Sequence, residues 1–135
     1  MNYWSYPGLE HREKILAINA SKSSQVNLHG ILDCCSFVFD ASPEELKSPS
    51  RLQHLALARH AFVKITRDRT GMSYAGIAEY LGKRNHATAV NSYRQAEALI
   101  ETDKYFRQNY RKILALMVKA QNVRQAAELI KLQVI

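Results

Sequence analysis

The sequence has few of the residues that interrupt helices. Its 135 residues contain three prolines, of which Pro49 is the last, and five glycines. Residues 50–135 therefore have no proline, which favours helices over a β-sandwich with frequent turns. The same scarcity of proline and glycine excludes collagen and low-complexity disorder. We therefore expect an all-α protein with six or seven helices.

Cysteine is also scarce, and the two cysteines present, Cys34 and Cys35, are adjacent. Neighbouring Cα atoms are too close for a relaxed disulfide, so we expect two buried, reduced thiols on one helix. Reduced thiols are typical of the cytoplasm, which is the predicted location. The sequence also lacks an apolar run of about 18 residues and an N-terminal signal pattern, so we expect no transmembrane span and no membrane partner.

Motifs for catalysis, metal binding and nucleotide binding are missing as well. The five histidines and two cysteines show no Cys-x-x-Cys or comparable spacing, so we predict no metal site. No Gly-x-x-x-x-Gly-Lys-Ser/Thr loop occurs that would hold a nucleotide phosphate. No Ser/His/Asp or Cys/His grouping indicates a nucleophile. We therefore predict that the protein is not an enzyme, binds no nucleotide and needs no cofactor.

Positive charge, in contrast, is abundant and unevenly distributed. Residues 1–50 carry 4 Lys+Arg against 6 Asp+Glu, whereas residues 51–135 carry 15 against 6. A basic part of this kind indicates a polyanionic partner, although a soluble protein with an incidental excess of lysine and arginine has the same composition.

Hydrophobic periodicity and helix-end signals predict a series of helices. Ser42 to Glu45 reads Ser-Pro-Glu-Glu, which has the residues of a capping box. Ser73 and Asn85 stand where two later helices begin. A strand is the competing interpretation for residues 35–39. The predicted helices span residues 9–20, 26–39, 52–70, 74–81, 86–100 and 104–117, with a short helix after Ser42 and an amphipathic tail over 118–135.

The helices predicted over 74–81 and 86–100 flank a short turn that contains glycine, which is the layout of a helix-turn-helix. In that motif the second helix lies in the major groove of DNA and its first residues face the bases. Asn85 and Thr88 have side chains that can hydrogen-bond bases, and Lys83 and Arg84 can bind phosphate. The pattern predicts double-stranded DNA as the partner. Capping of the helix is the simpler role for Asn85, and it does not exclude base contact.

The residues of this segment resemble a known family. Residues 73–90 read Ser-Tyr-Ala-Gly-Ile-Ala-Glu-Tyr-Leu-Gly-Lys-Arg-Asn-His-Ala-Thr-Ala-Val. They are similar to the C-terminal DNA-binding domain of the bacterial replication initiator DnaA, where Ser-Leu-Pro-Glu-Ile-Gly precedes Gly-Gly-Arg-Asp-His-Ser/Thr-Thr-Val. The spacing of Gly82, Arg84, His86 and Thr88 is the most specific part. The similarity extends from residue 27 to residue 117 and implies a compact all-α domain of the helix-turn-helix type.

The resemblance also implies which residues bind DNA. Arg59 and His60 occupy the places of an Arg-Gln pair that contacts DNA, and Arg67 that of a basic residue that meets phosphate. Arg51 lies in the loop from which the family inserts an arginine into the minor groove. The predicted DNA-binding residues are Arg51, Arg59, His60, Arg67, Lys83, Arg84, Asn85, His86, Ala87 and Thr88.

Four positions depart from the family pattern. Asn85 replaces an aspartate and Ala87 replaces a serine or threonine. His60 replaces a glutamine, and Lys83 replaces a glycine. The loop around Arg51 has one arginine where the family has several. We therefore expect DNA binding with a preferred site that differs from the standard initiator box.

These observations divide the chain into an N-terminal helical extension (1–25), a DnaA-like helix-turn-helix domain (26–118) and a C-terminal helical tail (119–135). The predicted function is double-stranded DNA binding in replication initiation or transcriptional control. An alternative is a protein-interaction or self-association module on the same fold, in which the extension or the tail takes part. RNA binding is a second alternative, and it requires exposed aromatic side chains for stacking.

Overall fold

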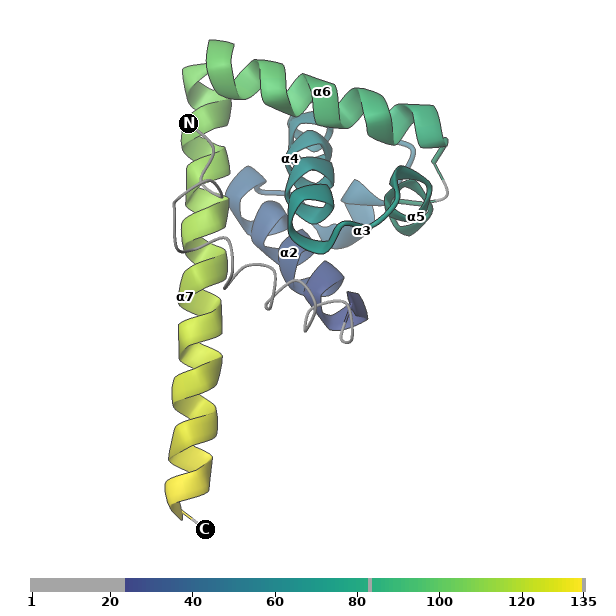
Figure 1. The fold of residues 1–135 in the computed structure, drawn as a ribbon. Coiled ribbons are helices and arrows are strands. Elements are labelled where there is room, and N and C mark those ends of the chain that lie inside the picture. The colour runs from purple at the N-terminus through teal and green to yellow at the C-terminus, as the bar shows by residue number, and fades with distance from the viewer. Residues whose placement is uncertain (1–23, 83, 135) are drawn as a thin grey trace.

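The computed structural model describes residues 24–82 and 84–134, and it places side chains over residues 28–82 and 84–119. Within these ranges the chain forms helices and turns without a strand, as Figure 1 shows, so the all-α prediction is confirmed. The helix predicted over 9–20 lies outside the described residues. The helices are α2 (Ser24–Phe39), α3 (Pro43–Leu46), α4 (Gln53–Thr70), α5 (Tyr74–Tyr80), α6 (His86–Thr102) and α7 (Lys104–Val134).

Helix α4 lies at the centre of the domain and packs against α2 and α6, while α7 runs along one edge against α2 and α6 (Figure 1). Apolar residues at helical spacing face this centre. The largest fully buried side chains include Leu32 of α2, Phe62 and Ile65 of α4, and Phe106 and Ile113 of α7. Burial of each such side chain is worth about 1.5–3 kcal/mol, so this core holds the helices in place.

The thiols of Cys34 and Cys35 are both buried in α2, as expected. Burial raises the pKa of the Cys35 thiol far above its usual value, and the neighbouring Cys34 adds to this effect. The thiol therefore stays protonated and behaves as a small apolar side chain. Residues 35–39 are helical and form the end of α2, so the competing interpretation of a strand is wrong.

The predicted caps are present at the helix ends. The Oγ of Ser42 accepts a hydrogen bond from the Glu45 amide, and the Glu45 carboxylate accepts one from the Ser42 amide, both at 3.1 Å. The Oγ of Ser73 accepts from the Gly76 amide at 3.1 Å. Gly71 ends α4 with φ +68°, a left-handed conformation that favours glycine. These local bonds fix where the short helices α3 and α5 begin.

Helix α7 differs from the sequence-based expectation of a helix over 104–117 and a separate tail. It continues without a break from Lys104 to Val134, and its C-terminal half projects beyond the other helices (Figure 1). No glycine or proline occurs in this range to end a helix. None of the described helices is long and apolar enough to cross a membrane.

Candidate nucleic-acid interface

Helices α5 and α6 form the predicted helix-turn-helix. Leu81 ends α5, and Gly82 follows it with φ +92°. The amide of Arg84 then donates to the Ala78 carbonyl at 2.9 Å, which folds the turn back on α5. The Oδ1 of Asn85 accepts from the Ala87 amide at 2.8 Å and caps α6. Local chemistry therefore places the start of α6 immediately after the turn.

The first turn of α6 is open to a ligand. Asn85, His86, Ala87 and Thr88 are all exposed. The opposite face of the helix is buried in the domain through Ala89, Ser92 and Ala96. A helix held in this way presents its N-terminal residues outward and carries positive partial charge at that end.

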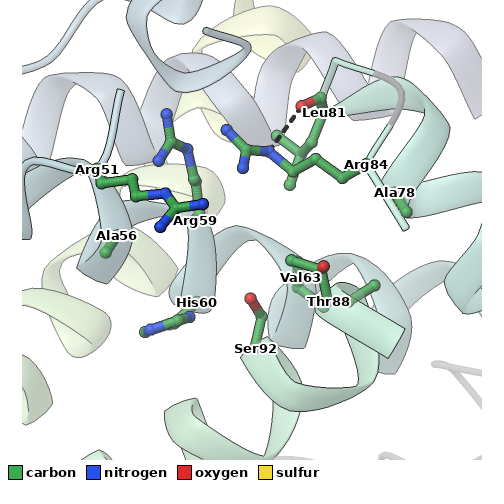
Figure 2. A pocket seen from close by; sticks show the side chains of 11 residues that line it. Arg51, Ala56, Arg59, His60, Val63, Ala78, Leu81, Arg84, Thr88 and Ser92 are labelled. Atoms are coloured by element: carbon green, nitrogen blue, oxygen red, sulfur yellow. Dashed lines mark hydrogen bonds between the residues drawn. The ribbon is translucent and has the colours of Figure 1, made fainter. Parts of the chain in front are cut away.

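A pocket of about 160 Å³ lies between the first turns of α6 and the N-terminal half of α4 (Figure 2). We call it the arginine pocket, because three arginines and no carboxylate line it. It brings together five of the predicted residues, and Val63, Leu81 and other apolar side chains complete its wall. The full lining is Arg51, Ala56, Arg59, His60, Val63, Ala78, Leu81, Arg84, Thr88, Ala89 and Ser92.

Arg59 is the least exposed of the three arginines, with 6% of its surface accessible. Its guanidinium donates four hydrogen bonds to backbone carbonyls just before α4. They run from Nε to Leu46 (2.9 Å), from Nη1 to Ser50 (2.6 Å), and from Nη2 to Glu45 (3.0 Å) and Ser48 (2.8 Å). Burial lowers the pKa of Arg59, and the nearby Arg84 lowers it further. Arg59, which the family resemblance predicts to contact DNA, therefore uses its guanidinium for hydrogen bonds within the protein.

His60 lies beside Arg59 and lines the same pocket. Its Nδ1 is buried and finds no hydrogen-bond partner among the described residues. Burial and the charge of Arg59 both lower the pKa of His60. The imidazole is therefore neutral at pH 7.

Arg67 lies away from the pocket, near the C-terminal end of α4. Its Nη1 donates to the Met72 carbonyl at 2.6 Å, and its guanidinium stands 4.5 Å from the ring centroid of Tyr74. The ring of His86 meets the same tyrosine edge-on, with 6.1 Å between centroids. Tyr74 therefore connects Arg67 with the start of α6. Sequence analysis did not assign it this role, because an aromatic residue in a short helix usually marks core packing.

Three of the predicted residues differ in how far they are exposed or described. Arg51 is exposed at the start of α4, and Arg84 is partly buried at the turn. Lys83 lies outside the described residues.

In the part of the chain that the structure describes, no group of three potential ligands gathers to hold a metal ion.

The fold and this site together define a helix-turn-helix protein. The chain belongs to the family described as the bacterial DnaA protein helix-turn-helix, whose profile matches residues 29–96. This segment runs from α2 into α6 and contains the whole arginine pocket. The resemblance read from the turn and the start of α6 is thereby confirmed.

The curated relatives that match this chain are DnaA proteins. The chain is 30% identical over 92 residues to the chromosomal replication initiator protein DnaA of Geobacter sulfurreducens, which is 68% of this chain and 21% of that protein. It is 31% identical over 86 residues to the DnaA of Porphyromonas gingivalis (64% and 18%). With the DnaA of Nostoc it shares 26% identity over 113 residues (84% and 25%). The chain thus spans about a fifth to a quarter of the length of these relatives.

Proposed function

We propose that this protein binds double-stranded DNA, with the first turn of α6 in the major groove and Arg51 in the adjoining minor groove. The observation that carries the proposal is the arginine pocket, which lies directly beside the exposed start of α6. Such clustered positive charge next to a helix N-terminus attracts the phosphates that flank a groove. Kinship with replication initiators supports a role in replication initiation or transcriptional control.

The proposal gives each of the predicted residues a role. Asn85, His86 and Thr88 are exposed at the start of α6, where side chains of a recognition helix meet base edges. The methyl group of Ala87 offers an apolar contact to thymine. We assign phosphate contacts to Arg67, which is held against Tyr74, and to Arg84, which is held at the turn, and Lys83 adds charge to the same turn.

We also propose that the protein works as a binding protein without catalysis and without a nucleotide. The family region that matches this chain is a helix-turn-helix, and no phosphate-binding loop occurs in the sequence. The buried, protonated Cys35 thiol suits a reducing compartment such as the cytoplasm.

Protein interaction or self-association is the second candidate function. The observation in its favour is the C-terminal half of α7, which extends beyond the other helices (Figure 1), together with the exposed side chain of Val118 in the same helix. A helix of this kind gains stability when a partner covers it, because most of the stability of helices in proteins comes from the packing of an amphipathic face.

Selection from a random DNA duplex pool tests the two functions together. The wild-type protein is incubated with the pool, bound duplexes are amplified, and affinity for the enriched sequence is compared with a shuffled duplex and a duplex RNA of equal length. Enrichment of one sequence, with RNA bound more weakly, supports the proposal. Failure to retain any duplex at low salt, with a concentration-dependent increase in mass, favours the interaction module.

A further inference from the structure

The loop between α3 and α4, residues 47–52, is held to the domain by one side chain of α4. The four hydrogen bonds of Arg59 end on carbonyls that lie 9 to 14 residues earlier in the sequence. Two of these carbonyls, those of Glu45 and Leu46, belong to the last turn of α3, and the Glu45 carbonyl also accepts from the amide (3.1 Å) and the hydroxyl (2.6 Å) of Ser48. The other two belong to the loop. Arg59 thus fixes both the end of α3 and the path that leads to Arg51.

The same loop is also docked on the helix-turn-helix. Arg84 donates through Nη2 to the Ser48 carbonyl and through Nε to the Leu81 carbonyl, so it joins the loop to the end of α5. Gly82 lies so close to the loop that a Cβ there would stand 2.2 Å from the Lys47 carbonyl oxygen. The ammonium of Lys47 in turn lies 4.4 Å from the ring centroid of Tyr80 in α5.

We propose that Arg59 is a positioning residue, and that it acts with Arg84 to lock the α3–α4 loop onto the turn before α6. The locked loop presents Arg51 at a fixed place relative to the recognition helix, so the two DNA-reading parts approach the duplex as one rigid unit. Arg59 contributes to affinity by removing the cost of ordering Arg51 when DNA binds. This inference rests on the proposed DNA-binding function.

A lysine cannot perform this task. Arginine has five N–H donors in a planar fork, which lets one buried group hold four carbonyls that diverge in space. Lysine keeps the positive charge but offers three donors from a single nitrogen atom. Arg59→Lys therefore separates the loss of the lock from the loss of charge.

A double-mutant cycle on the duplex selected by the wild type tests the inference. Arg59→Lys is expected to weaken binding about tenfold when Arg51 is present, and less than about twofold in the Arg51→Ala background, because its effect is transmitted through Arg51. The matched control is Arg67→Lys, a conservative change on the same helix outside the loop. Its effect is expected to be equal in both backgrounds, since Arg67 does not touch the loop.

An undiminished effect of Arg59→Lys in the Arg51→Ala background would mean that Arg59 contacts DNA itself, and the positioning role would be wrong. Failure of the wild type to bind duplex DNA overturns both proposals, so the two failures are distinguishable. If Arg59→Lys melts below the assay temperature, Arg59→Gln replaces it in the cycle, because glutamine also lacks the fork of donors and leaves the turn at Gly82 unchanged. The same dependence on Arg51 is expected, and additivity again contradicts the lock.

Discussion

Arg59 and Arg84 donate hydrogen bonds to the same acceptor, the carbonyl oxygen of Ser48. Two like charges are thus held side by side, and no carboxylate lines the pocket in which they lie. Their mutual repulsion contributes to the lowered pKa of Arg59. In the proposed complex a backbone phosphate beside Arg84 supplies the opposite charge that this pair lacks, so DNA binding is expected to relieve the repulsion between the two guanidinium groups.

The salt dependence of binding follows from the number of basic residues that contact phosphate. In the proposed complex Arg51, Arg67, Lys83 and Arg84 neutralise phosphates, whereas Arg59, with four hydrogen bonds to backbone carbonyls, does not. Release of four counterions gives a slope of log affinity against log salt of about −3.6. Fluorescence anisotropy between low and moderate salt measures it. Arg67→Ala is expected to reduce the slope by about one, and a flat response would contradict DNA binding through these residues.

Charge reversals on α4 are expected to have different consequences at its two ends. Arg59→Glu buries a carboxylate among four carbonyls that each lose one hydrogen bond, although those of Glu45 and Ser48 keep another donor, so the free energy of unfolding should fall by about 2–4 kcal/mol. Arg67→Glu removes one hydrogen bond at a half-buried position, so DNA affinity should fall while most of the stability remains. Urea denaturation of both variants followed by circular dichroism makes the comparison. Equal loss of stability in the two variants would contradict the different roles.

The stability of the protein is expected to depend on pH through His60. Burial and Arg59 lower the pKa of His60 in the folded state, so the unfolded chain binds a proton more readily. Stability should therefore be fully present above the ordinary histidine pKa of about 6.5, and should decrease as the pH falls below it towards the folded-state pKa.

The His60→Gln variant removes this titration and keeps a polar side chain. The drop in melting temperature between pH 7.5 and pH 5 should be smaller in His60→Gln than in the wild type. His54→Gln is the matched control, because His54 lies on the same helix but is exposed. An equal drop in all three proteins would show that His60 does not set the acid sensitivity.

The helix boundaries and caps could be predicted because their causes are local. Ser42, Ser73 and Asn85 each bond to an amide two or three residues away, so residue type and spacing are sufficient to find them. The exposed start of α6 followed from the same signals. Resemblance to the family then supplied the residues that the pattern alone did not mark.

The role of Arg59 could not be predicted in this way. Its acceptors are backbone carbonyls that lie far away in the sequence, and every residue has a carbonyl, so no pattern of side chains identifies them. The contact of Gly82 with Lys47 is hidden for the same reason, since it depends on how two distant segments meet. The continuity of α7 was missed because the sequence contains no residue that either requires or forbids a break near residue 118.

The base preference of the protein is expected to depend on Asn85, which caps α6 through Oδ1 and is nevertheless exposed. The amide oxygen has a second lone pair and the amide nitrogen has two hydrogens, so the capping side chain still presents an acceptor and a donor. This pair matches adenine, and the methyl group of Ala87 suits the thymine of an A·T pair. Sequences selected by the wild type should therefore contain A·T where this turn docks.

Asn85→Asp replaces the donor with a second acceptor, which suits the amino group of cytosine. The preference should move towards cytosine by about 1–3 kcal/mol, measured by competition between duplexes that differ at this base pair. The melting temperature should stay nearly unchanged, because aspartate caps a helix about as well as asparagine. Asn85→Ser is the control, since serine also caps but its single hydroxyl cannot make the paired donor and acceptor contact that asparagine makes with adenine, and it should lose the preference without gaining cytosine. Identical selected sequences for all three proteins would show that Asn85 serves only as a cap, and that His86, Thr88 and Arg51 carry the specificity.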